Sequence, residues 1–114
     1  MPRKKEGLFD FLDEANVQIL KNLKQTRMGY TDLMKSSPVS SGAFSQRINQ
    51  LISLGLVRVD YNEKERRPLY SLTPTGRRIL ELLEEIEKVY KEGVSLEEKE
   101  LKWIEESLKK SKED

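Results

Sequence analysis

The chain has 114 residues, of which 36% are hydrophobic and another 36% are charged, and its formal net charge is +1 at pH 7. A chain of this length can form one domain with a modest core and an appended helical element. No apolar run approaches the roughly 20 residues that a membrane span needs, and the N-terminal MPRKKEG lacks the apolar stretch of a secretory signal, so we expect a cytoplasmic protein.

The absence of cysteine and histidine restricts the chemistry of the chain. It removes thiol nucleophiles, disulfides, the usual zinc sites and the side chain that most often serves as a general acid or base near neutral pH. The sequence also shows no phosphate-binding loop, metal-ligand set or nucleophile–base pair. We therefore expect that the protein is not an enzyme and needs no cofactor.

Charges of opposite sign are concentrated in the two parts of the chain. Residues 1–78 contain 14 Lys or Arg and 8 Asp or Glu, a net charge of +6, whereas residues 79–114 contain 7 and 12, a net charge of −5. The first part can lie against a polyanion, which would repel the second. We predict a folded domain at 1–78, with a short basic arm, and an acidic helical region at 79–114.

The N-terminal part contains the arm and a first helix. Residues 1–7 are basic and end in glycine, so they are either a loose terminus or an arm that contacts phosphates. Apolar residues at helical spacing over residues 8–23 predict the helix, which could begin again at Asp10 or Asp13, because either side chain can cap a helix. The basic residues of the arm are Arg3, Lys4 and Lys5.

Two further helices are predicted between residues 30 and 54. The spacing of apolar residues indicates a short helix at 30–35, which Ser36, Ser37 and Pro38 end, because a proline biases the residue before it away from helix. A longer helix then begins near Ser40 or Ser41, where a hydroxyl can accept from a free amide of the first turn. A short helix, a tight turn and a longer helix in this order form a helix-turn-helix arrangement.

The longer helix has two different faces. Phe44, Ile48 and Leu51 fall on one side, which indicates a buried face. The opposite side carries no charged residue, although 36% of the chain is charged. Gln and Asn can make paired hydrogen bonds to adenine in the major groove, and Ser and Gly allow close approach, so this side is either a base-reading face or a polar surface without a partner. Its residues are Gly42, Gln46, Asn49 and Ser53, flanked by Ser45 and Gln50.

A β-hairpin is predicted after the longer helix. Gly55 can end the helix, and strand-like sequences follow at 56–61 and 69–72. The connection at 62–68 is too long for a two-residue turn and too charged to be buried, so it should project as a tongue. Three cations of this connection suit phosphates or a narrow minor groove; the alternative is an ordinary charged loop. They are Lys64, Arg66 and Arg67.

The C-terminal region is predicted to be helical. Thr73 and Pro74 form a strong helix start, and Arg77 and Arg78 then fall in the first turn, where the helix dipole disfavours cations unless an anion or a carboxylate lies nearby. Glu92 and Gly93 are predicted to interrupt the helix, with a capping box of Ser95 and Glu98 starting a last one.

Two amphipathic helices outside a small domain need a surface to bury against. A second copy of the chain would provide it, and the alternative is that the helices fold back on their own domain. The residues expected in a dimer interface are Leu82, Leu83, Ile86, Val89, Tyr90, Leu101, Trp103, Ile104 and Leu108.

Four segments, in this order, resemble winged helix-turn-helix transcription regulators of the MarR and HxlR kind, with similarity also to the ArsR group. NVQILKNL at 16–23 and YTDLM at 30–34 are similar to the two helices before the turn. SQRINQLISLGLV at 45–57 and YSLTPTGRRIL at 70–80 resemble the recognition helix, the wing strands and the following helix. The resemblance covers about residues 12–80 and implies a mainly α fold with a small β-hairpin (α+β), followed by C-terminal dimerisation helices.

The resemblance implies a dimeric DNA-binding regulator, usually a repressor, on a pseudo-palindromic duplex. By this resemblance the helix would lie in the major groove with Ser41, Ser45, Gln46 and Asn49 near bases, and Arg66 occupies the place of the family's wing arginine. Gln50, which flanks the polar face, completes the expected base-reading set. The set expected at the DNA backbone or in the wing is Tyr30, Thr31, Arg47, Lys64, Arg66, Arg67 and Arg77. Arg47 lies near the apolar flank of its helix, so a phosphate or an internal acidic partner is expected for it before a base edge.

The chain departs from the family pattern in two ways. Its recognition helix has a single cation, Arg47, so attraction to DNA depends on the wing and the arm, and the wing also carries Glu63 and Glu65. Two alternatives remain: a sequence-tolerant architectural DNA-binding protein, and a protein-interaction module that uses the acidic helices. The sequence does not give the operator, the target genes, the direction of regulation or a small-molecule effector.

Overall fold

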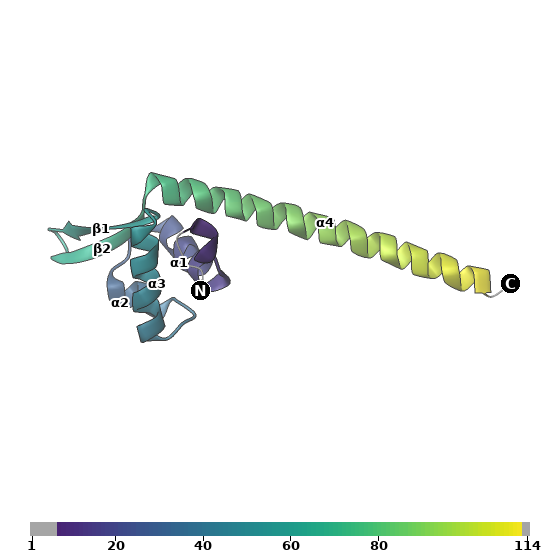
Figure 1. The fold of residues 1–114 in the computed structure, drawn as a ribbon, viewed down its shortest axis with the longest axis horizontal. Coiled ribbons are helices and arrows are strands. Elements are labelled where there is room, and N and C mark those ends of the chain that lie inside the picture. Colours follow the sequence, from purple (N-terminus) through teal and green to yellow (C-terminus); the bar gives the residue numbers. More distant parts are fainter. Residues whose placement is uncertain (1–6, 113–114) are drawn as a thin grey trace, which may run out of the picture. The chain divides into compact units, whose positions relative to one another are not determined.

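The computed structural model of the protein describes residues 7–112, so the predicted basic arm with Arg3, Lys4 and Lys5 lies outside the described residues. Its contacts divide the chain into a first unit that ends at Leu80 and a second that begins at Glu81. The predicted fold class is confirmed: the fold is mostly helical, with one antiparallel hairpin (Figure 1). The elements are η1 (Leu8–Asp10), α1 (Glu14–Gln25), α2 (Tyr30–Lys35), α3 (Ser41–Ser53), β1 (Val57–Asn62), β2 (Arg67–Leu72) and α4 (Pro74–Lys112).

The first predicted helix is broken at one of the two expected aspartates. Residues 8–10 form the short 3-10 turn η1, and α1 begins after Asp13, whose Oδ1 accepts the backbone N–H of Asn16 at 2.9 Å. This bond satisfies one of the amides that the first turn of a helix leaves free. The chain therefore restarts its helix at Asp13.

Helix α3 begins and ends at local signals in the sequence. Ser40 is the N-cap, and its hydroxyl accepts from the Ala43 N–H at 3.5 Å. At the other end Gly55 has a φ of 77°, and its N–H and that of Leu56 donate to the Ile52 and Leu51 carbonyls, each at 3.0 Å. This is the Schellman arrangement, in which a left-handed glycine ends a helix.

The hairpin has a shorter turn than the sequence predicted. Its strands pair from Val57 with Leu72 to Asn62 with Arg67, which leaves only residues 63–66 in the turn. The Asn62 side chain accepts the Glu65 N–H at 2.9 Å, and Arg66 takes a φ of 53°. These two local features allow the chain to reverse within four residues, so both strands extend into the predicted tongue.

A third chain segment adds to the sheet, which the sequence did not predict. Met28, between α1 and α2, forms an antiparallel bridge with Tyr70 of β2. Their backbone N–H groups donate to each other's carbonyls, at 3.1 and 2.7 Å. Strand β2 is therefore the central strand of the first unit, with β1 on one side and the Met28 segment on the other.

The core of the first unit is built from α1, α2, α3, the base of the hairpin and the start of α4. The predicted buried face of α3 is confirmed, since Phe44, Ile48 and Leu51 are all in this core. The buried core residues are Ile19, Leu20, Leu23, Leu33, Phe44, Ile48, Leu51, Leu56, Val57, Leu72 and Leu80.

Helix α4 starts as predicted, but the predicted interruption is wrong. The Thr73 hydroxyl accepts the Gly76 N–H at 2.9 Å and donates to the Gly55 carbonyl at 2.6 Å. The helix then continues through Glu92 and Gly93 to Lys112, so the expected capping box does not start a new helix. A helical glycine costs only about 1 kcal/mol relative to alanine, and the surrounding Leu, Glu and Lys are strong helix formers.

Candidate nucleic-acid interface

The predicted base-reading face of α3 is exposed in the first unit. Gly42, Gln46, Asn49 and Ser53 lie on the solvent side, opposite the buried side. The Ser53 hydroxyl donates to carbonyls of its own helix, to Asn49 O at 2.9 Å and to Gln50 O at 3.2 Å. Among residues 7–112 the Gln46 and Asn49 amides have no hydrogen-bond partner, so they are the groups that α3 offers to a partner.

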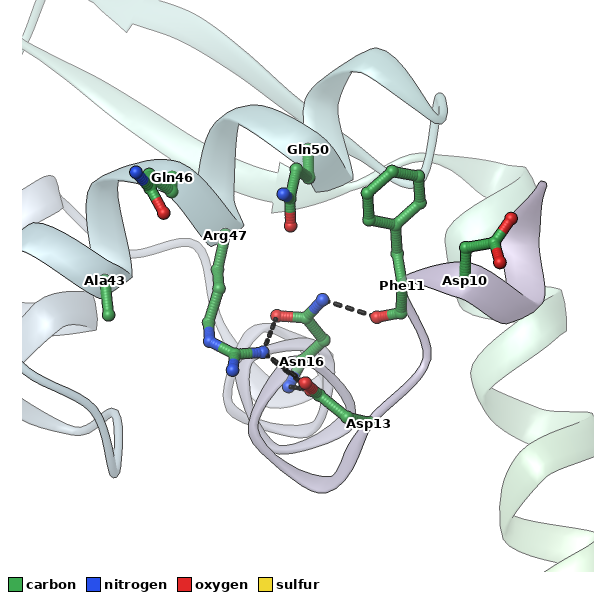
Figure 2. A pocket seen from close by; sticks show the side chains of 8 residues that line it. All are labelled: Asp10, Phe11, Asp13, Asn16, Ala43, Gln46, Arg47 and Gln50. Atoms are coloured by element: carbon green, nitrogen blue, oxygen red, sulfur yellow. Dashed lines mark hydrogen bonds and ion pairs between the residues drawn. The ribbon is translucent and has the colours of Figure 1, made fainter. Parts of the chain in front are cut away.

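The remaining predicted base-reading residues lie at the ends and sides of this face. Ser41 is exposed in the first turn of α3, whereas Ser45 and Gln50 are half-buried. Gln50 and Gln46 line a hollow of about 230 Å³ between α3 and the start of α1 (Figure 2). Since Gln50 is half-buried whereas Gln46 and Asn49 are exposed, Gln46 and Asn49 are the central pair of the face.

Arg47 joins α3 to the start of α1 rather than pointing outward. Its Nη1 donates to both carboxylate oxygens of Asp13, at 2.7 and 2.6 Å, and to Asn16 Oδ1 at 3.1 Å (Figure 2). Asn16 is only 1% exposed, and its side-chain amide donates to the Phe11 carbonyl. The sequence analysis expected either a phosphate or an internal acidic partner for Arg47, and in the structure Asp13 is that acidic partner. The contact with the buried Asn16 was not predicted.

The carboxyl group of Asp13 is held in its ionised form. Burial alone would raise its pKa, but the hydrogen bonds from Arg47 and the Asn16 N–H, together with the charge of Arg47, lower the pKa below its usual 3.8. A carboxyl group with a lowered pKa stabilises the fold above its unfolded-state pKa, and this contribution is lost as the pH falls through the folded-state value.

We expect an Asp13→Asn variant to be less stable than the wild type at about pH 7 by up to roughly 1 kcal/mol, because the ion pair is partly exposed and asparagine still caps the helix. The difference should shrink when the pH is lowered from about 7 to about 3, below the unfolded-state pKa of aspartate, because a carboxyl with a lowered pKa loses its stabilising contribution in this direction. Urea unfolding of both proteins at the two pH values measures it. A difference that stays constant would show that the charge of Asp13 contributes nothing.

The wing presents two of its three predicted cations. Lys64 and Arg66 are exposed in the turn. Arg67 instead contacts two carboxylates: its Nη2 lies 3.1 Å from Glu65 Oε1, and its Nη1 lies 3.7 Å from Asp32 Oδ2. Arg67 thus links the wing to α2, and it also neutralises one of the two acidic residues that the sequence placed in the wing.

The other predicted backbone contacts have different environments. Tyr30 is half-buried, and its ring meets Phe44 edge-on with the ring centres 5.2 Å apart, while Tyr70 lies 6.1 Å away. Thr31 is exposed beside it. Arg77 is exposed at the start of α4, where its Nη1 lies 3.5 Å from the Lys24 carbonyl. Tyr30 therefore packs against the core and is only partly accessible to a partner.

The second unit consists of α4 from Glu81 onward and carries an exposed apolar stripe. Of the predicted interface residues Leu83 is half-buried, and the others expose between 43% and 70% of their surface. Charged residues alternate with the apolar ones, and no helix in the described part of the chain is long and apolar enough to cross a membrane. The exposed members are Leu82, Ile86, Val89, Tyr90, Leu101, Trp103, Ile104 and Leu108, with Leu96 in addition.

Comparison with known proteins gives one family match. The family described as winged helix-turn-helix matches residues 13–91, which run from the cap of α1 into α4. No curated protein sequence matches the chain significantly.

Solved structures share the fold at low sequence identity. A MarR-family transcriptional regulator from Porphyromonas gingivalis W83 is 24% identical, with a TM-score of 0.58 over 77% of this chain and 93% of that chain. A homodimeric winged helix-turn-helix DNA-binding domain from Mycobacterium bovis is 20% identical, with a TM-score of 0.63 over 75% of this chain and 79% of that one.

A longer MarR-family transcriptional regulator from Silicibacter pomeroyi DSS is also similar. It is 17% identical, with a TM-score of 0.65 over 72% of this chain, but this chain spans only 56% of its length.

Proposed function

The chain belongs to the winged helix-turn-helix family, and we propose that it is a DNA-binding transcription regulator that binds a pseudo-palindromic duplex as a homodimer. We assign it the role of a repressor that acts in the cytoplasm. The observation that carries the proposal is the uncharged, amide-bearing face of α3, which is exposed, as are Lys64 and Arg66 in the turn of the wing. Side-chain amides on a helix can read base edges in the major groove, where each base pair presents a distinct pattern of donors and acceptors.

The two parts of the surface have separate roles. Gln46 and Asn49 supply sequence preference through base edges, because neither amide is used inside the described part of the protein. Lys64 and Arg66 supply attraction, because contacts to phosphates or the minor groove depend on charge and little on sequence. Arg47 contributes less to attraction, since its guanidinium is already paired with Asp13.

The apolar stripe of α4 supports assembly with a second copy. Leu82, Ile86, Val89, Gly93 and Leu96 recur at alternating steps of four and three residues, the spacing of a coiled-coil seam. A seam of this kind exposed along a single helix leaves large apolar side chains in water, which a partner helix would cover. The similar domain from Mycobacterium bovis is homodimeric, and its fold supports the same state for this chain.

Selection of bound duplexes from random DNA tests the proposed function. An enriched motif with two-fold symmetry is the expected result, because a symmetric dimer presents two copies of α3 to the duplex. Binding that depends on salt but enriches no motif would identify a sequence-tolerant architectural protein instead. Absence of binding to any duplex would favour the protein-interaction module.

We expect Arg66→Ala and Asn49→Ala to weaken binding in different ways. Arg66→Ala should weaken binding to every duplex and reduce the slope of log K against log salt by about 0.9, the value for one lost phosphate contact. Asn49→Ala should leave the slope unchanged and remove roughly 1–3 kcal/mol of discrimination at one base position.

Fluorescence anisotropy over a salt series, with the selected duplex and single-base variants of it, measures both quantities. Lys102→Ala, which removes an exposed lysine from the second unit, is the matched control for loss of charge. If the two interface variants behaved alike, the division between base reading and attraction would be wrong.

A further inference from the structure

A basic hollow on the outer surface of the sheet lies apart from the base-reading face. Its volume is about 600 Å³, and it is lined from the segment before α2, from both strands and from the start of α4. No residue of α3 lines it. Its charged and hydroxyl-bearing lining residues are Arg27, Arg58, Asp60, Ser71 and Arg77.

The alternation of side chains across the sheet brings two arginines and a serine into one row. Met28 and Tyr70 form the bridge between their segments, and both pack against the core. Successive side chains of an extended chain point to opposite faces, so Arg27 and Ser71 share the outer face. Ser71 also pairs with Arg58 in the hairpin register. With neighbouring strands about 4.8 Å apart, the two arginine backbones lie about 10 Å apart with the serine between them.

A third arginine reaches the same hollow from a helix start. Arg77 is in the first turn of α4, and its Nη1 makes only a long contact of 3.5 Å to the Lys24 carbonyl. The N-terminus of a helix carries a partial positive charge, so a cation there is unfavourable unless a negative group lies nearby. An anion in the hollow would contact Arg77 and would relieve this repulsion.

The hollow has more positive than negative charge. Asp60 is the one carboxylate among its lining residues, and it is paired with Arg58, with Arg58 Nε 2.7 Å from Asp60 Oδ2 and Nη2 3.1 Å from Oδ1. Within residues 7–112 the Arg27 guanidinium has neither a hydrogen-bond nor an ion-pair partner. The charges of Arg27 and Arg77 are therefore not balanced by a carboxylate of the hollow.

We propose that this hollow binds a phosphate group. Arg27 and Arg77 supply the charge, the Ser71 hydroxyl is a further donor, and Arg58 stands at the edge with its carboxylate partner. The planar guanidinium fork matches the spacing of phosphate oxygens, and hydrogen bonds between charged groups are about twice as strong as neutral ones.

The bound phosphate group can come from two sources. The phosphate belongs either to the DNA backbone outside the segment that α3 reads, in which case the inference rests on the proposed function, or to a free phosphate-bearing molecule.

Binding of inorganic phosphate to the full chain tests the site directly. The NMR resonances of the arginine side-chain N–H groups are followed while phosphate replaces chloride at constant ionic strength. We expect saturable shifts for Arg27 and Arg77, and about tenfold weaker binding in Arg27→Gln, because one charge-assisted hydrogen bond is lost. Arg77→Gln should weaken binding similarly from a different element. Lys99→Gln, which removes the charge of an exposed lysine of α4, should bind as the wild type does.

Anisotropy with a duplex over a salt series in phosphate-free buffer distinguishes the two sources. If the phosphate belongs to DNA, Arg27→Gln lowers the salt slope by about 0.9 relative to Lys99→Gln. If it belongs to a free molecule, the two variants have the same slope, and only the binding of inorganic phosphate differs.

Equal phosphate binding and equal salt slopes in the two variants would overturn the proposal. A wild-type protein that binds inorganic phosphate in the hollow but binds no duplex would instead overturn the proposed function, and the phosphate site would remain.

Discussion

A Gly76→Ala variant is expected to lose about 3 kcal/mol of folding free energy, although alanine is normally the better helix former. A Cβ atom at this position would lie 2.0 Å from the Leu56 carbonyl oxygen and 2.8 Å from its carbon, both of which are backbone atoms. The same oxygen accepts the Thr73 N–H at 3.0 Å, so it cannot move away without lengthening that bond. Overpacking of this kind typically costs 1–3 kcal/mol, to which a weakened hydrogen bond adds about 1 kcal/mol.

Thermal unfolding followed by circular dichroism measures the effect of Gly76→Ala. Each kcal/mol lowers the melting temperature of a domain of this size by about 4–8 °C, so a loss of about 3 kcal/mol should lower it by roughly 12–24 °C. Gly93→Ala is the matched control, because a Cβ atom at Gly93 meets no heavy atom within 4 Å. The control should be more stable than the wild type by about 0.5–1 kcal/mol. If Gly76→Ala were as stable as Gly93→Ala, the close approach of α4 to Leu56 would be wrong.

The double variant Ile86→Glu/Val89→Glu is expected to be monomeric and to bind its full duplex site about 100-fold more weakly, or worse. Both side chains are exposed within their own chain, Ile86 by 65% and Val89 by 62%, so glutamate should leave the fold of the first unit intact. In a dimer each glutamate would place an unpaired charge in a buried seam, which is strongly unfavourable. A monomer also loses the second binding site, and linking two sites raises affinity by about 10²–10⁴-fold.

Analytical ultracentrifugation and anisotropy against full-site and half-site duplexes measure the two parts of this prediction. Lys88→Gln is the control: it removes one positive charge at an exposed position between Ile86 and Val89, and this variant should remain dimeric. The double variant Ile86→Glu/Val89→Glu should bind a half-site duplex with the affinity of a single wild-type subunit. If instead the wild type is itself monomeric and the double variant melts at a lower temperature, the stripe packs against its own chain, and the dimer is ruled out.

Those parts of the fold that depend on neighbouring residues could be predicted from the sequence. The bounds of α2, the cap at Ser40, the glycine end of α3 and the start of α4 at Pro74 all follow from signals within a few residues of each boundary. The bridge between Met28 and Tyr70 could not be predicted in this way, because its two partners come from separate segments and only the folded chain brings them together. The break expected at Gly93 was wrong because glycine weakens a helix without ending it.

The candidate site shows the same division. The outer face of α3 could be predicted because it depends on one helical period, and the structure leaves Gln46 and Asn49 exposed on it. The partners of the charged residues could not be predicted, because each ion pair joins distant parts of the chain. Arg47 lies 34 positions from Asp13, and Arg67 lies 35 positions from Asp32. Likewise, Arg27 and Arg77 line one hollow although they lie 50 positions apart, and no local pattern in the sequence predicts this.

The end of α3 and the start of α4 meet at a polar junction in the first unit. The Gly55 carbonyl, just past the end of α3, accepts the Thr73 hydroxyl, and the first turn of α4 rests on the next carbonyl along the chain. We therefore expect a rotation of the start of α4 to displace the end of α3, because these backbone contacts join the two segments directly. In the proposed dimer, this junction would couple the orientation of the pairing helices to the orientation of the base-reading helices. We therefore expect the contacts between α3 and α4 to influence which half-site spacing the dimer binds best.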